Sequence, residues 1–73
     1  MMLKLTSSEI TFLKNKKIDF KKDYDYSKEE AFSLLEQVYE VETVYADGET
    51  KVDLRLASIY ADIADKIQSQ IPE

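Results

Sequence analysis

The strongest structural signal in this sequence is a long segment without a helix breaker. Residues 28–47 contain neither glycine nor proline, and they follow Ser27, which forms a capping box with Glu30. Apolar residues recur along the segment at the spacing of one helix face. They are Ala31, Leu34, Leu35, Val38, Val41 and Tyr45. The pattern predicts an amphipathic helix over residues 28–46, with Gly48 in the left-handed conformation that ends many helices.

A second helix is predicted directly after this one. Thr50 and Asp53 form a weaker capping box, and the helical spacing then continues to Gln70, before Pro72. The predicted helix over residues 51–70 has a main apolar face with Tyr60 beside it; the face comprises Val52, Leu56, Ile59, Ile63 and Ile67. Because the connection is short, the two helices are expected to form an antiparallel hairpin.

The N-terminal part of the chain predicts two smaller elements. Thr6 and Glu9 form a capping box that starts a helix over residues 7–16, and Leu5 and Ile10 occupy the hydrophobic-staple positions. Residues 17–26 then read as an extended strap, with alternate side chains facing the core: Ile18, Phe20, Tyr24 and Tyr26. We therefore expect one all-α domain spanning residues 1–73, a helical hairpin with a short helix and a strap packed across it.

The residue types present limit the chemistry of this chain. Cysteine and histidine are absent, so a disulfide, a thiolate metal site and an imidazole base are all excluded. Asp23, Asp25, Ser27 and Glu29 resemble the start of a calcium loop, but Lys28 and Leu34 stand where that loop needs glycine and glutamate. With no phosphate loop or nucleophile elbow, we expect no enzyme activity, no cofactor, no metal and no small-molecule substrate.

Charge and hydropathy suggest where the protein acts. Residues 1–22 carry a net charge of +4 and residues 23–73 a net charge of −9. This asymmetry favours contact with another charged surface or between copies of the chain, although solubility alone would also explain the acidic part. Neither a signal peptide nor a membrane-spanning run of apolar residues is apparent, which leads us to expect a cytoplasmic protein without membrane contact. The excess of lysine over arginine suggests an AT-rich bacterial or mobile-element genome.

One line of small residues on the last predicted helix is a candidate interface: Leu54, Ala57, Ala61 and Ala64. Small side chains allow two helices to approach closely. In a monomer, the first helix and the strap could fill this seam. In a homodimer, a second subunit could fill it, and the sequence favours neither alternative. A chain of 73 residues has little core of its own, which keeps the homodimer open.

Three carboxylates on the helix over residues 28–46 are also candidates for function. Glu36 and Glu40 are predicted to form an acidic surface, which serves either solubility or the binding of a basic protein. Glu42 interrupts the apolar face, so it is either a buried carboxylate that marks a functional site or a rim carboxylate. The rim carboxylate is favoured, and it would reach solvent or pair with Lys51 or Arg55.

The leading functional hypothesis is a protein–protein interaction or regulatory module that binds itself or another protein. The alternative is a weak nucleic-acid-binding protein. Its phosphate contacts would come from lysines interleaved with aromatic residues: Lys14, Lys16, Lys17, Lys21 and Lys22. Three aspartates interrupt this basic segment, which makes nucleic acid the less favoured partner.

Overall fold

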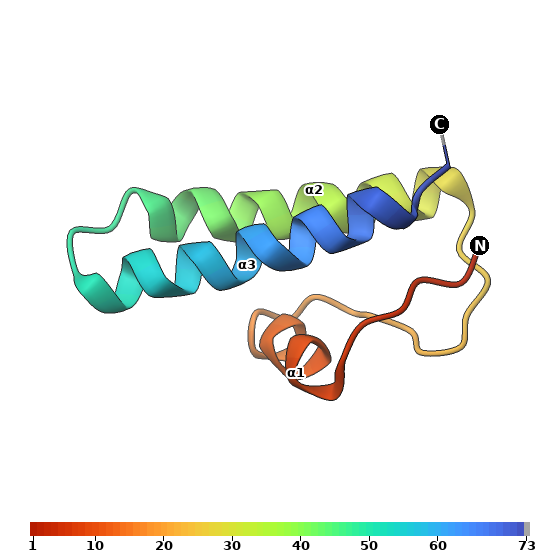
Figure 1. Cartoon of the computed structure of the whole chain (residues 1–73), viewed down its shortest axis with the longest axis horizontal. Coiled ribbons are helices and arrows are strands. Elements are labelled where there is room, and N and C mark those ends of the chain that lie inside the picture. Colours follow the sequence, from red (N-terminus) through yellow and green to blue (C-terminus); the bar gives the residue numbers. More distant parts are fainter. Residues whose placement is uncertain (73) are drawn as a thin grey trace.

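Two long helices form an antiparallel hairpin, and a third, short helix packs across it. The computed structural model describes residues 1–72, and its helices are α1 (Ser7–Asn15), α2 (Lys28–Ala46) and α3 (Lys51–Gln70). Helices α2 and α3 pack closely side by side, and α1 crosses beneath them (Figure 1). The predicted all-α class and the hairpin are confirmed, and α1 ends at Asn15, one residue earlier than predicted.

Two of the three predicted capping boxes are complete. The Thr6 hydroxyl accepts a hydrogen bond from the Glu9 amide, and the Glu9 carboxylate accepts one from the Thr6 amide. Ser27 and Glu30 repeat this arrangement at the start of α2. At α3 the Thr50 hydroxyl accepts from the Asp53 amide at 3.1 Å, without the return bond. The shorter side chain of aspartate explains the missing half of the box.

The prediction for Gly48 is wrong in its conformation. Gly48 does not adopt a positive φ, because α2 ends on Asp47 in a right-handed geometry and the Gly48 amide donates to the Tyr45 carbonyl oxygen at 3.0 Å. Glycine is needed there for a different reason. A Cβ at Gly48 would lie 2.5 Å from the Cβ of Asp53, so the start of α3 leaves no space for a side chain.

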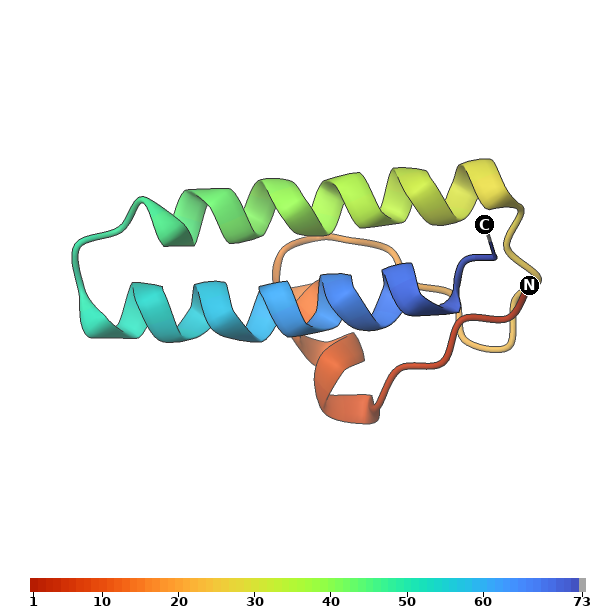
Figure 2. The same cartoon turned by 45° about the horizontal axis from the view of Figure 1, so that its top comes forward.

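The strap places its apolar side chains in the core, as predicted. Ile18, Phe20 and Tyr26 are buried and Tyr24 is half-buried. The strap bends rather than running straight, because Lys17 and Asp23 both have φ values of 58°. The N-terminal segment meets the end of the strap near the N-terminus, where Met2 and Asp25 form a bridge (Figure 2), and Lys4 then bonds to Gln70 of α3. Leu3 in this segment is buried, a contribution to the core that the sequence did not predict.

The core lies between the hairpin and the layer formed by α1 and the strap. Its most buried large side chains come from all three helices: Tyr60, Leu13, Ile63, Ile67 and Val38. Val52, predicted on the main apolar face of α3, is instead 66% exposed. It belongs to the end of the hairpin that α1 does not reach.

Candidate interaction surface

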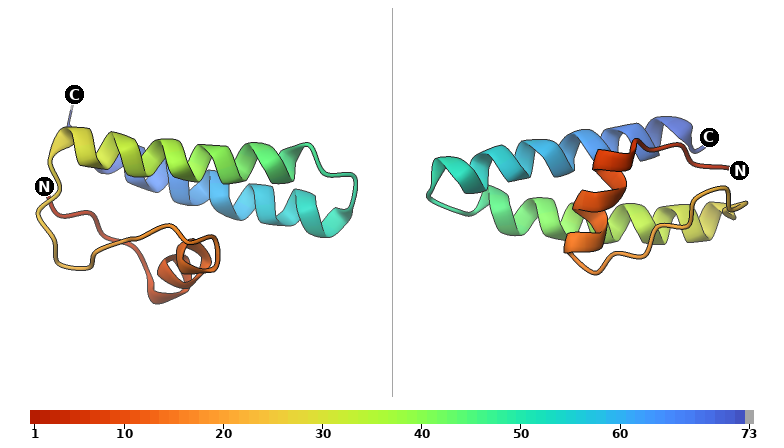
Figure 3. Two further views of the ribbon diagram at one scale, coloured as in Figure 1. Left: turned by 180° about the vertical axis from the view of Figure 1, so that it is seen from behind. Right: turned by 90° about the horizontal axis from the view of Figure 1, so that it is seen from below.

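Helix α1 is fixed beneath the middle of the hairpin by polar contacts with α3. The Tyr60 hydroxyl donates to the Phe12 carbonyl oxygen at 2.7 Å, and the Lys66 ammonium donates to the Glu9 carboxylate at 2.8 Å. Viewed from below, α1, the strap and the N-terminal segment cover only the half of the hairpin that holds the chain termini (Figure 3). In the same view, no backbone of residues 1–72 lies beneath the half nearer the α2–α3 connection.

Apolar side chains line this half of the underside, which we call the uncovered end. We define it by six residues: Val41, Val44 and Tyr45 of α2, and Val52, Leu56 and Ile59 of α3. Val44 is 70% exposed and Val52 is 66% exposed, the two largest values among the large apolar side chains of residues 1–72. The other four are half-buried and pack against the core. The uncovered end is thus a continuous apolar extension of the core surface.

The uncovered end is hollowed where it meets α1. A pocket of about 320 Å³ is lined by Lys16, Val41, Val44 and Tyr45. The Lys16 ammonium lies 4.5 Å from the centre of the Tyr45 ring, within the range of a cation–π contact. Hydrogen bonding to the Tyr45 side chain raises the pKa of Lys16 above its usual value of 10.5. Lys16 therefore places a positive charge at the rim of an apolar pocket.

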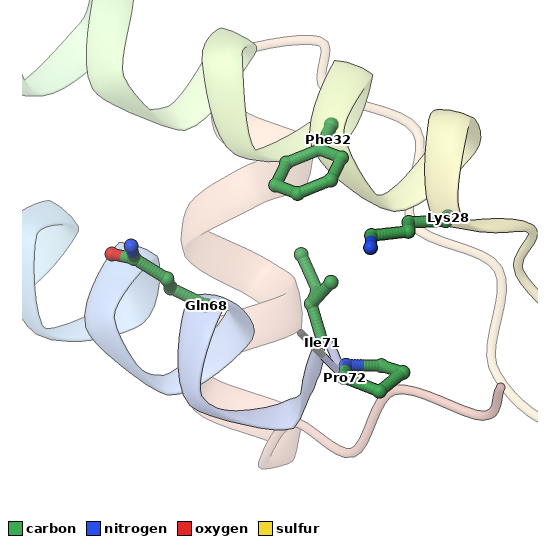
Figure 4. Close-up of a pocket in the computed structure, with 5 residues that line it drawn as sticks. All are labelled: Lys28, Phe32, Gln68, Ile71 and Pro72. Carbon is green, nitrogen blue, oxygen red and sulfur yellow. The ribbon is translucent and has the colours of Figure 1, made fainter.

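A second pocket lies at the opposite end of the hairpin. Its volume is about 230 Å³, and its lining comes from the start of α2 and the end of α3 (Figure 4): Lys28, Phe32, Gln68, Ile71 and Pro72. The Gln68 side-chain oxygen already accepts a 2.9 Å hydrogen bond from the Tyr39 hydroxyl. Ile71 is buried as part of the core, which leaves Phe32 as the main apolar group facing solvent here.

The predicted seam is largely occupied within the chain. Ala64 is fully buried and Ala57 is 9% exposed, whereas Ala61 is half-buried and Leu54 is 53% exposed. Gln68 continues the same helical line and bonds to Tyr39 of α2. Within the chain, this line therefore faces α2. Of the four predicted interface residues, only Leu54 and Ala61 are accessible.

The predicted carboxylates lie where solvent reaches them. Glu36 and Glu40 are exposed on the outer side of α2, and Glu42 is half-buried at its edge. Within the described residues, Glu42 forms no ion pair with Lys51 or Arg55. The ion pairs within residues 1–72 join the N-terminal amine to Asp25 and Lys66 to Glu9.

The lysines predicted to contact nucleic acid are all exposed, but the aromatic rings between them are engaged elsewhere. Phe20 and Tyr26 stack on each other inside the core. The Tyr24 hydroxyl donates to the Glu30 carboxylate at 2.6 Å, which raises the pKa of Tyr24 and lowers that of Glu30. Lys21 lies over the Tyr24 ring, and Lys16 lies over Tyr45. These rings are therefore not arranged as a platform on which bases could stack.

Two of the residues that resemble a calcium loop bind to main-chain groups. Asp25 pairs with the N-terminal amine and Ser27 caps α2. In the part of the chain that the structure describes, no three acidic side chains are grouped to hold a metal ion. Across residues 1–72, each helix is too short or too polar to cross a membrane.

Comparison with protein-family models, with curated proteins and with solved structures gives no match. The candidate surface is therefore defined by its geometry alone. Sequence reasoning missed Val44, which lies between the apolar and polar sides of α2. A geometric argument points to it: α1 crosses the hairpin, so it covers about one helix diameter, roughly 10–12 Å, of the length of α3. Since 20 residues of α3 span about 30 Å, part of the hairpin stays uncovered.

Proposed function

We propose that this protein is a small, non-enzymatic protein–protein interaction module of the cytoplasm, and that it binds through the uncovered end. The observation that carries the proposal is the exposure of Val44 and Val52 next to the half-buried residues of that end. Contiguous apolar patches on small proteins commonly mark binding surfaces. Single exposed apolar residues carry no such meaning, which is why the proposal rests on the whole group.

The proposed surface has the parts that a protein interface requires. Burying a valine side chain contributes on the order of 1.5–3 kcal/mol at most, and this surface holds two exposed valines. The pocket beside Val44 can receive an apolar anchor, the kind of residue that contributes most to interface affinity. Lys16 at the rim can pair with a carboxylate of the partner and so fix the orientation of binding.

The acidic side of α2 has a supporting role in this proposal. Glu36 and Glu40 lie on the polar side of α2 and keep it hydrated. Charged residues are depleted at the centres of interfaces, so we place these two glutamates outside the contact. The charge reversals Glu36→Lys and Glu40→Lys are therefore expected to leave binding through the uncovered end intact.

Weak nucleic-acid binding is the second proposal, supported by the exposure of Lys14, Lys16, Lys17, Lys21 and Lys22. With the neighbouring rings engaged, such binding would rest on phosphate contacts alone, and its affinity would fall steeply with salt. Titration of labelled single-stranded and double-stranded oligonucleotides at low salt tests it. Absence of binding at micromolar protein concentration would remove this alternative.

Site-specific photocrosslinking in cells of the native host tests the main proposal. A photoreactive amino acid replaces Val52 in one version of the protein and Leu54 in the other, because both side chains are exposed but lie on different sides of α3. The proposal predicts covalent protein adducts from position 52 and few from position 54. Equal yields from the two positions, or no adduct from position 52, would contradict it.

A further inference from the structure

We infer that a second copy of this chain occupies the uncovered end. The two copies are related by a two-fold axis that lies in the plane of the interface and runs across the hairpin, perpendicular to its long axis. This inference rests on the proposed function and names its partner. In such an isologous dimer the same surface contributes twice. Helix α2 then lies over its own copy in the opposite direction, and α3 does the same.

Charge complementarity between the two ends of the surface supports a second copy. One end is closed by α1, where Lys16 lies at the pocket and Lys14 and Lys17 flank it in sequence. The other end is the α2–α3 connection, where Asp47 and Glu49 are exposed. The two-fold rotation brings the acidic connection of each copy against the basic end of α1 in its partner. Both contacts are attractive, and both form at once.

The positions of these charges across the width of the hairpin also fit the two-fold arrangement. Lys16 is the C-cap of α1 and lies against Tyr45, so the basic end of α1 is on the α2 side of the hairpin. Asp47 directly follows α2 and lies on that same side. Because the rotation places α2 over α2, Asp47 of one copy approaches Lys16 of the other rather than the far edge of α3.

The apolar residues match under the same rotation. Val44 and the pocket next to it face the same groups of the second copy across the axis. The α3 residues of the uncovered end, Val52, Leu56 and Ile59, face their counterparts in the same way. The stretch of α3 available, residues 51–59, is about 13 Å long. An overlap of this length is at the small end of protein interfaces, so we expect a reversible dimer rather than an obligate one.

The opposite face of the hairpin is a poorer site for a second copy. Its exposed apolar residues are Phe32, Tyr39 and Leu54, spread over both helices. The residues that border them include Glu36 and Asp65, both exposed. Two copies packed through this face would bring carboxylates together, and like charges at an interface are unfavourable.

The first test compares two matched aspartate substitutions by sedimentation velocity over a range of protein concentrations. Val52→Asp puts a carboxylate on the uncovered end and Leu54→Asp puts one on the opposite face, and both positions are exposed in the monomer. We expect a wild-type dimer whose dissociation constant rises at least roughly ten-fold in Val52→Asp, since burying an unpaired carboxylate is costly. Leu54→Asp is expected to change it less than about two-fold. Equal effects, or a larger effect of Leu54→Asp, would overturn the inference.

The second test reverses the charges at each end. Lys16→Glu with Lys17→Glu makes the α1 end net acidic although Lys14 remains, and Asp47→Lys with Glu49→Lys makes the α2–α3 connection basic. Each variant alone then carries like charges at both contacts and is expected to be monomeric. Mixed in equal amounts they regain opposite charges at both contacts and are expected to form a heterodimer. Failure of the mixture to associate, with both variants folded by circular dichroism, would overturn the two-fold arrangement.

These outcomes separate the inference from the proposed function. A wild-type chain that stays monomeric at near-millimolar concentration overturns the second copy as occupant. If position 52 still gives adducts in the photocrosslinking experiment, the proposed interaction surface stands with a different protein as its partner. If position 52 gives none, both fail.

Discussion

The Tyr60 hydroxyl of α3 donates a 2.7 Å hydrogen bond to the main-chain carbonyl oxygen of Phe12 in α1, and the two aromatic rings meet edge to face with centroids 6.0 Å apart. Tyr60 is only 1% exposed. The pair fixes the position of α1 along the hairpin. It therefore determines which apolar residues are covered and which form the uncovered end.

Removing the Tyr60 hydroxyl is expected to destabilise the fold. Tyr60→Phe keeps the ring but leaves the Phe12 carbonyl oxygen without its partner, which we expect to lower the free energy of unfolding by about 1–2 kcal/mol. Tyr39→Phe is the matched control, because its hydroxyl bonds to Gln68 at an exposed site and water can replace it. Urea denaturation measures both. Equal losses of unfolding free energy would show that the buried hydrogen bond contributes no more to stability than the exposed one.

Stability is expected to fall at alkaline pH because of the same residue. Burial raises the pKa of Tyr60 above its usual value of 10.0. A group that holds its proton more tightly when folded keeps its full contribution below the unfolded pKa and loses it as the pH rises through the folded pKa. The free energy of unfolding should therefore decline above about pH 10. Tyr60→Phe should decline less over the same range, as followed by urea unfolding at several pH values.

Glu9 is expected to affect stability at acidic pH. Burial alone would raise its pKa, but the hydrogen bonds from Lys66 and Thr6 outweigh this and lower the pKa below its usual value of 4.5. Stability from this carboxylate is therefore present above about pH 4.5 and is lost as the pH falls through the folded pKa.

The substitution Glu9→Gln tests this acid dependence. At neutral pH it should lower the free energy of unfolding by on the order of 1 kcal/mol, because a charge-assisted bond to Lys66 becomes a neutral one. Below the folded pKa of Glu9 the two proteins should converge. A stability difference that stays constant from neutral pH to pH 3 would contradict the role of the carboxylate charge.

Gly48 is expected to tolerate no side chain. In Gly48→Ala the new Cβ would lie 2.5 Å from the Cβ of Asp53, so we expect a loss of about 1–3 kcal/mol from overpacking. A double-mutant cycle with Asp53→Gly removes the opposing atom. Thermal or urea unfolding should then show that the alanine costs less in the Asp53→Gly background. Equal costs in both backgrounds would exclude the clash as the cause.

The bounds of the helices could be predicted from the sequence better than the neighbours that pack on each helix. The bounds of α2 and α3 followed from uninterrupted helical spacing between two clear stops, and the N-terminal capping residues followed from local hydrogen-bond chemistry. Such signals act within a few residues of the chain. They predict where a helix begins and ends, but they carry little information on which neighbour covers it.

The candidate site depended on those neighbours, which explains what the sequence analysis missed. Val52 shares the helical spacing of Ile63 and Ile67, yet it is exposed because α1 is held near Tyr60 and does not extend to the α2–α3 connection. Ala57 and Ala64 are buried, and the line that they form faces α2, a neighbour that the spacing of small residues does not identify. Periodicity identifies an apolar face without identifying what packs on it.

Methyl-resolved NMR of valine and leucine side chains during dilution is the most direct test of the central claim, that the uncovered end is the contact surface and a second copy its occupant. We expect the Val44 and Val52 methyl resonances to shift together as the protein concentration changes, while those of Leu54 stay fixed. A shift of Leu54 with Val44 and Val52 unchanged would place the contact on the opposite face. Methyl resonances that all stay fixed up to near-millimolar concentration would contradict the dimer.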